Sequence, residues 1–159
     1  MSSYLRVPLT RSASSGREAR EIVRTWLADV GRSHAEYVST QVVTELVANA
    51  VVHAHEPIAL HLWVRRDGVR IGVSDGSTVE AVPLPDDPSA PAGRGLRLVE
   101  RLTSGWGSDV HDRGKITWAE VTERSSVLVP ADPGDASSGR GARWHLAWRG
   151  EGATLPPAG

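Results

Sequence analysis

Three polar residues of different chemistry recur at four-residue intervals in TELVANAVVHA, residues 44–54: Glu45, Asn49 and His53. On a helix, this spacing places side chains on neighbouring turns of one face. The amide oxygen of Asn49 can coordinate a hard cation such as Mg²⁺, and the carboxylate of Glu45 can accept a proton from an attacking hydroxyl or water. The alternative is a partly exposed face that tolerates polar residues, because short helical spacings also recur by chance.

A second candidate is the carboxylate of Asp75 in IGVSDG, at the end of an expected strand. An ionised carboxylate accepts hydrogen bonds, so it can bind an exocyclic amine such as that of adenine. The alternative is a turn aspartate before Gly76, which is a common arrangement. In a later strand, Thr117 can offer a hydroxyl to a base or is simply a β-branched strand residue, and Lys115 is expected as a solvated lysine near a hairpin turn.

The sequence GRGL, residues 93–96, opens a helix directly after a long loop. Gly93 and Gly95 let backbone N–H groups approach a ligand, and a helix N-terminus favours anions, so phosphate is the natural guest. Arg94 can add positive charge, and Leu96 begins the apolar side of the helix. The alternative is a flexible joint between loop and helix. The P-loop pattern GxxxxGK[ST] is absent from the chain.

Composition argues against several other kinds of chemistry. The chain has no cysteine, which excludes disulfides and thiolate metal sites and fits a cytoplasmic protein. It has no HExxH-type histidine set and no GxSxG elbow, so neither a zinc site nor Ser-His-Asp catalysis is expected. A formal net charge of −1 gives no reason to expect direct nucleic-acid binding. No apolar run is long enough to span a bilayer and no secretory signal is visible, so no membrane association is expected.

The chain of 159 residues is long enough for one domain with a substantial core that holds these side chains in place. Periodicity and turn residues predict an edge strand at 4–9, helices at 12–31 and 33–53, a hairpin of 57–66 and 69–75, a loop at 76–92, a helix at 93–102, and a hairpin of 106–111 and 115–121. Grouped helices and antiparallel pairs predict an α+β fold, a two-layer α/β sandwich with a mixed sheet covered on one face by helices.

The chain is predicted to divide near residue 125. Residues 1–124 carry the periodic elements and form one domain, whereas the extension 125–159 is rich in Gly, Ser and Pro and is expected to be flexible. Alternating Trp144, Leu146 and Trp148 predict a short strand at 143–149 within this extension.

Together, the motifs resemble those of one protein superfamily. ELVANAVVH on a helix, VSDG at the end of a strand, a loop, GRGLRLV at the start of a helix and GKITW on a strand follow the order found in the GHKL superfamily of ATP-binding domains. The chain looks most like the small anti-sigma factor serine/threonine kinases of bacterial partner-switching systems. The resemblance covers residues 5–123 and implies a Bergerat-type sandwich, with the histidine-kinase-like ATPase fold, that holds ATP and Mg²⁺ between helices and sheet.

The resemblance also implies a role for each motif residue. Glu45 matches the general base, Asn49 the Mg²⁺ ligand, and Asp75 with Gly76 the motif that reads adenine. The glycine-rich phosphate contact is matched by Gly93, Arg94, Gly95 and Leu96. Thr117 matches the hydroxyl on the side of the base, and His53 matches a position near the phosphates. Residues 76–92 match the ATP lid. One departure is the adenine motif, usually DxGxG, which reads Asp75-Gly76-Ser77 here.

The resemblance implies a regulatory protein with two partners. An anti-sigma factor serine kinase phosphorylates a serine of an antagonist protein and sequesters a sigma factor, and small kinases of this branch often form homodimers. The alternative is a nucleotide-binding regulatory module that transfers no phosphate. A third possibility is a protein that has lost nucleotide binding and acts through protein contacts alone.

Overall fold

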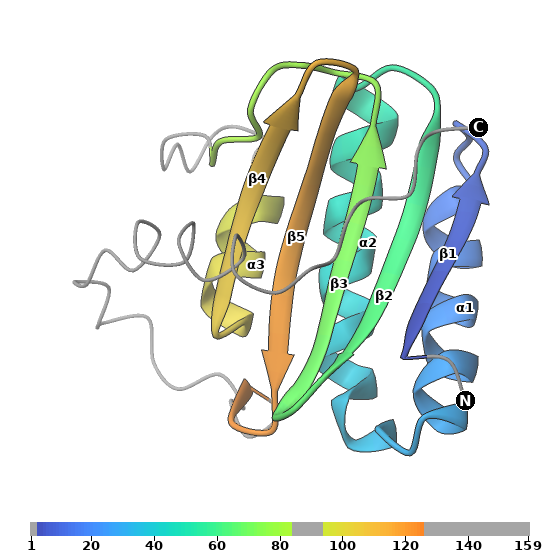
Figure 1. Ribbon diagram of the computed structural model, residues 1–159, viewed down its shortest axis with the longest axis vertical. Coiled ribbons are helices and arrows are strands. Elements are labelled where there is room, and N and C mark those ends of the chain that lie inside the picture. The colour runs from blue at the N-terminus through green and yellow to red at the C-terminus, as the bar shows by residue number, and fades with distance from the viewer. Residues whose placement is uncertain (1–2, 84–93, 126–159) are drawn as a thin grey trace.

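The computed structural model describes residues 3–83 and 94–125, which form five strands and three α-helices (Figure 1). Their order is β1 (Tyr4–Leu9), α1 (Ser15–Asp29), the 3₁₀ turn η1 (Ser33–Ala35), α2 (Glu36–His53), β2 (Ile58–Arg65), β3 (Gly68–Asp75), α3 (Gly95–Leu102), β4 (Gly105–His111) and β5 (Gly114–Thr122). Each strand and helix predicted within these residues is confirmed, with its ends shifted by a few residues at most.

Three of the predictions fall on residues outside the described part. Gly93 is among these residues, and the helix predicted from it is described from Gly95 onward. The loop predicted at 76–92 is described as far as residue 83. The extension is described only at Ser125, so the strand predicted at 143–149 also lies outside the described residues.

The helices differ in how much of their surface faces the core. In α1, the buried Ala19, Val23 and Leu27 recur every four residues, so this helix buries one side. The central helix α2 packs against α1, α3, β3 and β5, and it buries apolar residues around more of its circumference. The short helix α3 is anchored by Leu96 and Val99. The layer of helices therefore centres on α2, which lies behind the middle of the sheet (Figure 1).

The five strands form one sheet in the order β1-β2-β3-β5-β4, in which every neighbouring pair is antiparallel. The sheet therefore differs from the predicted mixed sheet in this detail. Two helices connect β1 to β2, which reverses the direction of the chain between them. The strands β3 and β4, joined through α3, run parallel (Figure 1), but β5 lies between them and is antiparallel to both.

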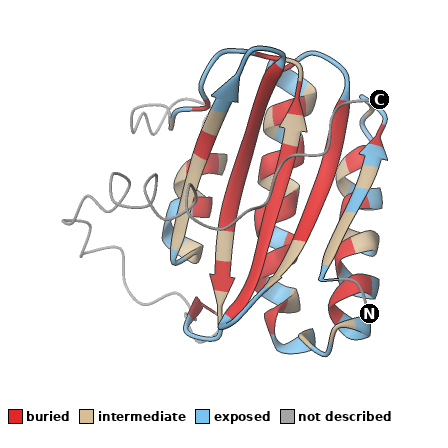
Figure 2. Ribbon diagram, viewed as in Figure 1, coloured by how far each residue is buried: buried red, intermediate tan, exposed pale blue. Residues whose placement is uncertain are grey.

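All three α-helices cover the same face of the sheet, and the core fills the space between the two layers (Figures 1 and 2). The sheet contributes to this core mainly through Leu60, Leu62, Val69, Ile71, Val73, Ala119 and Val121. These residues share one strand face because they alternate along β2, β3 and β5 in matching register. The arrangement confirms the predicted two-layer α+β sandwich. Within residues 3–83 and 94–125, no helix combines the length and apolar character that a bilayer crossing requires.

The opposite face of the sheet, here called the outer face, carries aromatic and charged side chains. The rings of Tyr4, His61 and Trp63 stack across β1 and β2, with centroids 5.4–6.1 Å apart. The guanidinium of Arg70 lies 4.3 Å from the ring centroid of Trp118 on β5. Both faces of the central strands therefore carry packed side chains, in agreement with the buried residues along them (Figure 2).

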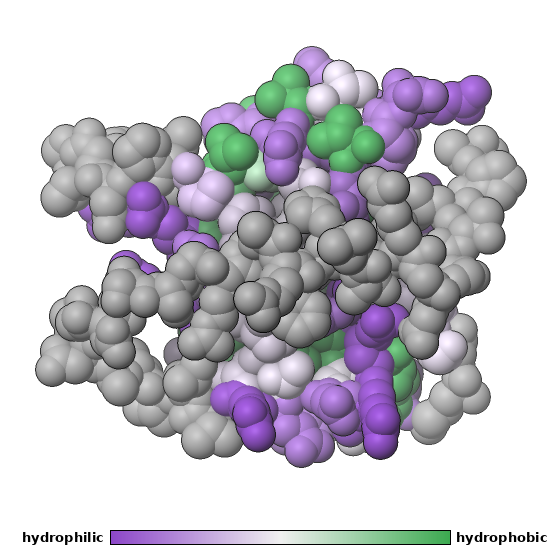
Figure 3. All heavy atoms as spheres, turned by 60° about the vertical axis from the view of Figure 1, so that its left-hand side comes forward, coloured by the Kyte–Doolittle hydropathy of each residue, from purple (hydrophilic) through white to green (hydrophobic). Residues whose placement is uncertain are grey.

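One end of the sandwich, here called the upper end as drawn in Figure 1, holds the C-terminal ends of α2, β3 and β4. Seen from the side of α3 and β4, hydrophobic residues lie among hydrophilic ones at this upper end (Figure 3). The exposed apolar residues of these elements and of the segment after β3 are Val52, Val79, Val82 and Val110. The upper end therefore carries both the motif carboxylate of Asp75 and apolar surface.

Candidate functional site

The polar residues of α2 lie as their four-residue spacing predicts. Glu45 and Asn49 are half-buried on neighbouring turns, whereas His53, the last residue of the helix, is exposed. The residues that fix this part of α2 to the core are Leu46, Val47 and Ala50. The helix thus offers an acid and an amide from a rigid position, while His53 lies at the upper end, apart from the cavity described below.

The N-terminus of α3 lies directly against the carboxylate of Glu45. A Cβ atom placed on Gly95, the first residue of α3, would overlap Glu45 Oε2. Only a residue without a side chain lets the carboxylate come this close to the helix N-terminus. The sequence GRGL is therefore more than a flexible joint, because its second glycine shapes the contact between α2 and α3.

A cavity of about 280 Å³ adjoins this contact and is lined by Glu45, Arg94, Gly95, Arg97, Leu98 and Arg101. Three of its six lining residues are arginines, and α3 adds the partial positive charge of its N-terminus. Guanidinium groups and helix N-termini both bind phosphate well. The cavity therefore combines an anion-binding surface with one carboxylate. Leu96 is buried in the core instead of lining it.

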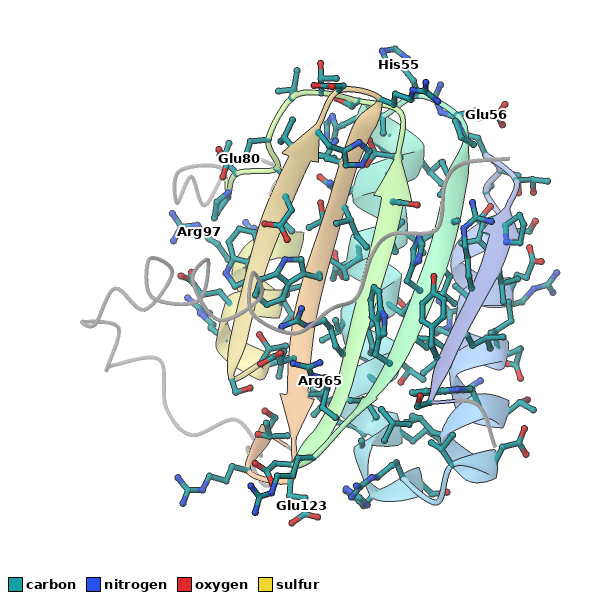
Figure 4. The ribbon with its side chains drawn as sticks, in the orientation of Figure 1. His55, Glu56, Arg65, Glu80, Arg97 and Glu123 are labelled. Carbon is teal, nitrogen blue, oxygen red and sulfur yellow. The ribbon has the colours of Figure 1, made fainter. Side chains whose placement is uncertain are left out.

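Two of these arginines, Arg97 and Arg101, were not among the candidates from the sequence. Their signal is nevertheless visible, because they follow Arg94 at intervals of three and four residues on one helical side. Figure 4 shows the side chain of Arg97 at the edge of the molecule where α3 lies. Helical spacing relative to Arg94 would have identified both residues.

Asp75 ends β3 with its side chain buried on the helix-covered face of the sheet. Its Oδ1 atom accepts a hydrogen bond from the backbone N–H of Ser77 at 2.8 Å and one from Lys115 Nζ at 3.0 Å. In the sheet register, Lys115 lies directly opposite Asp75. The expectation of a solvated turn lysine is therefore wrong, since β5 begins one residue before Lys115 and directs its side chain inward.

Gly76 makes a tight contact with the end of the connection between α2 and β2. Its N–H donates to the His55 carbonyl at 2.7 Å, and a Cβ atom at this position would lie 2.7 Å from the Glu56 carbonyl oxygen. The side chains of His55 and Glu56 project at the upper end (Figure 4). The glycine after Asp75 therefore allows β3 to end against this connection.

Thr117 lies two residues after Lys115 on the same face of β5, opposite Val73. Its side chain is buried, and Thr117 Oγ1 has no hydrogen-bond partner among residues 3–83 and 94–125. A buried hydroxyl without a partner is costly, and a native structure usually provides one from protein, water or ligand. Opposite Thr117 on the neighbouring strand β4 lies Ser108, whose hydroxyl accepts a hydrogen bond from the N–H of Ala81 at 3.2 Å.

The candidate residues form two groups joined by α2, which packs against both α3 and β3. The first group is the cavity between α2 and α3, lined by Glu45 and three arginines, with Asn49 one turn after Glu45 on α2, and it suits the phosphates of a nucleotide. The second is Asp75, Lys115 and Thr117 on the sheet, and it suits a polar ring edge. The orphaned hydroxyl of Thr117 and the arginine-lined cavity are the two features that best fit a nucleotide.

Comparison with known proteins gives one family and a structural neighbour. A family model described as the histidine kinase-like ATPase domain matches residues 9–122. The crystal structure of the RsbU and RsbW domains of Rv1364c from Mycobacterium tuberculosis matches with 20% identity and a TM-score of 0.56, over 76% of this chain. This chain spans 32% of that longer one, and at this identity the likeness concerns the fold. No curated protein matches the chain.

The family match runs from the end of β1 to the end of β5, so it contains every candidate residue from Glu45 to Thr117. It confirms the resemblance to the GHKL superfamily that the order of the motifs indicates. On the evidence of that match and of the two-layer sandwich, the chain belongs to the histidine kinase-like ATPase domain family.

Proposed function

We propose that the protein is an anti-sigma factor serine kinase, which binds ATP with Mg²⁺, phosphorylates a serine of an antagonist protein and sequesters a sigma factor. Membership of the ATPase domain family implies nucleotide binding. The observation that carries the catalytic part is the Glu45 carboxylate held against Gly95 at the N-terminus of α3, beside three arginines. The neighbouring fold adds only an analogy for the activity.

The phosphates are bound by the cavity between α2 and α3. Arg94, Arg97 and Arg101 supply positive charge, and the N-terminus of α3 supplies backbone donors. Close approach of phosphate at this helix end needs a glycine, which Gly95 provides. Gly93, which lies outside the described residues, is assigned to the same phosphate contact in this proposal.

Glu45 acts as the general base. Its carboxylate accepts the proton of the attacking serine hydroxyl, as a positioned acidic residue does in other phosphoryl-transfer sites. Asn49, one turn later on the same face, offers an amide oxygen to Mg²⁺, which binds oxygen ligands and needs few from the protein when phosphates are present. When bound, the ion neutralises charge on the phosphate oxygens.

The base of the nucleotide is read on the sheet side. Asp75 accepts a hydrogen bond from the exocyclic amine of adenine, beside Gly76, and Thr117 Oγ1 gains the partner that the buried hydroxyl lacks. For His53, at the exposed end of α2 and outside the arginine-lined cavity, only the resemblance implies a place near the phosphates.

The remaining parts of the proposal concern partners and organisation. The partners are an antagonist protein with a phosphoacceptor serine, a sigma factor and a second copy of this chain in a homodimer, with no direct contact to nucleic acid or membrane. The protein acts in the cytoplasm. Residues 1–124 form the ATP-binding domain, and residues 125–159 are a separate extension. The presence of RsbU and RsbW domains in the neighbouring structure supports a partner-switching setting by analogy.

A second candidate function is a nucleotide-binding regulatory module without phosphotransfer. The adenine motif favours it, because this chain reads Asp75-Gly76-Ser77 instead of the usual DxGxG. Under this alternative, ATP binding alone changes the contacts made with partner proteins.

Calorimetry and a phosphotransfer assay separate the two functions. The full chain is titrated with ATP with and without Mg²⁺ and is then incubated with labelled ATP and with each small protein encoded beside its gene as a candidate antagonist. Glu45→Ala should keep ATP affinity and lose phosphotransfer by about 10²- to 10⁴-fold, the usual contribution of a general base.

The matched control is Glu100→Gln, which removes an exposed carboxylate of α3 outside the cavity and should behave as wild type. Equal phosphotransfer by wild type and Glu45→Ala would remove Glu45 as the base. ATP binding by wild type without any transfer would favour the second candidate.

A further inference from the structure

The buried ion pair between β3 and β5 is not needed to hold these strands together. The strands already pair in antiparallel register from Gly68 to Asp75, and the pair lies near one end of that ladder. The side chains of Lys115 and Asp75 are 4% and 1% exposed. Removing two charges from water costs several kcal/mol per ion, so a buried pair is a weak source of stability. Its presence therefore needs another explanation.

The bonds within the pair leave donors and an acceptor available. Both hydrogen bonds to the Asp75 carboxylate, from Lys115 and from the N–H of Ser77, end on Oδ1. Within the described residues, no bond uses Oδ2. An ammonium group has three N–H donors, and the ion pair occupies one of those of Lys115. An acceptor and a donor thus lie side by side at the end of β3.

Thr117 adds an independent observation on the same face. Its buried Oγ1 has no hydrogen-bond partner in the part of the chain that the structure describes, and Thr117 lies two residues after Lys115 on the same face of β5. The segment after β3 passes close to Thr117, since the N–H of Ala81 donates to the hydroxyl of Ser108, which lies opposite Thr117 on β4. A flat polar ligand that displaces this segment would meet all three side chains.

We propose that Lys115 is a second base-reading residue, which donates a hydrogen bond to ring nitrogen N1 of a 6-aminopurine while Asp75 Oδ2 accepts from its 6-amino group. This inference rests on the proposed nucleotide binding and deepens it, because it assigns base specificity to a donor and an acceptor that act together. The ion pair is then a preorganised binding site for the base, in which Lys115 also fixes the orientation of the Asp75 carboxylate.

The pairing discriminates between purines through the direction of the hydrogen bonds. Adenine presents a donor at position 6 and an acceptor at N1, which match Asp75 and Lys115. Hypoxanthine presents the reverse, an oxygen acceptor at position 6 and an N–H at N1, so the oxygen would face a carboxylate and the N–H an ammonium. A buried site strongly rejects a base that places acceptor against acceptor and donor against donor, because none of these groups then has a hydrogen-bond partner.

The test uses calorimetry on the full chain with Mg²⁺ and three nucleotides: ATP, 1-deaza-ATP, in which a C–H replaces N1, and inosine triphosphate. Hydrogen bonds to charged groups are worth about 1.5–3 kcal/mol, so wild type should bind 1-deaza-ATP about 10- to 100-fold more weakly than ATP. Inosine triphosphate should bind more weakly still.

Two variants complete the cycle. Lys115→Met should bind ATP about 10- to 100-fold more weakly and should no longer distinguish ATP from 1-deaza-ATP. Arg113→Met, which removes an exposed cation of the adjacent turn, should retain the wild-type preference. Circular dichroism shows whether each variant folds, and if Lys115→Met does not, the comparison of the two nucleotides on wild type decides alone.

The outcomes separate this inference from the proposed function. If wild type binds ATP and 1-deaza-ATP equally well, Lys115 does not read N1, and ATP binding itself stands. If Lys115→Met folds and still prefers ATP as wild type does, the assignment to Lys115 is likewise overturned. If wild type binds none of the three nucleotides, the proposed function fails and this inference fails with it.

Discussion

His61 makes the stability of the fold depend on pH in the mildly acidic range. Its ring is buried on the outer face, with Nδ1 at 2.8 Å from the Tyr4 hydroxyl and Nε2 at 2.8 Å from Ser74 Oγ. Burial lowers the pKa of His61 from 6.5 to about 4, and the positive charge of Arg6 adds to this effect. The folded protein therefore resists protonation at a site that the unfolded chain protonates readily.

The sign and the size of the effect follow from these two pKa values. Between pH 6.5 and about 4, the unfolded state binds more protons than the folded state, so acid favours unfolding. The stability is complete above the unfolded pKa and is lost as pH falls toward the folded one. Linkage gives a loss of about 2 kcal/mol on going from pH 7.5 to pH 5, and a limit of about 3 kcal/mol below pH 4.

Urea denaturation at pH 7.5, 6, 5 and 4 measures this loss. His61→Gln removes the titrating ring and keeps the other ionisable groups, so its free energy of unfolding should fall by about 2 kcal/mol less than that of wild type between pH 7.5 and 5. His34→Gln, at an exposed histidine, should follow the wild-type profile. Parallel profiles for wild type and His61→Gln would refute the reasoning, because the acid sensitivity would then arise elsewhere.

Three further substitutions test the geometry of the site and the sheet. Gly95→Ala should leave the thermal midpoint unchanged or raised, because alanine favours helix, yet should slow phosphotransfer about tenfold or more, because its Cβ displaces the carboxylate of the proposed base Glu45. A phosphotransfer assay and thermal unfolding together check this, and an unchanged transfer rate would contradict it. Gly114→Ala should lower the free energy of unfolding measured in urea by about 2–4 kcal/mol, because φ of Gly114 is +152° and the added Cβ would overlap the backbone carbonyl oxygen of Asp75 on β3. A loss below about 1 kcal/mol would argue against this strain. Arg70→Met should lower the free energy of unfolding by about 2 kcal/mol, because the guanidinium donates to the carboxylate of Glu120 on β5 through Nε at 3.0 Å and Nη2 at 2.5 Å. A urea midpoint equal to that of wild type would show that this pair contributes nothing to stability.

Local patterns predicted most of the elements and part of the site. The four-residue spacing of Glu45 and Asn49 places both on one side of α2 because a helix repeats every 3.6 residues, whatever packs against it. Likewise, the turn at Asp67-Gly68 predicts the hairpin of β2 and β3. The order of the motifs was enough to identify the superfamily, and the family match confirms it.

The environment of Lys115 could not be predicted from local patterns. Its place beside a turn suggested a solvated side chain, but strand alternation carries it inward with Thr117, Ala119 and Val121. Which face of β5 meets the helices depends on the side of the sheet on which they pack, and that information is not in the strand itself. The same holds for His61, which lies on the outer face and is nevertheless buried.

The sequence by itself determined the helices, the strands, the α+β class and the superfamily, because helical periodicity, strand alternation and turn chemistry act over a few residues. Only the tertiary structure decided that β5 lies between β3 and β4, which puts Lys115 opposite Asp75, and that α3 begins against Glu45. Strand order and helix packing are set by burial of apolar surface between segments far apart in the chain. The two groups of the candidate site therefore exist only in the folded protein.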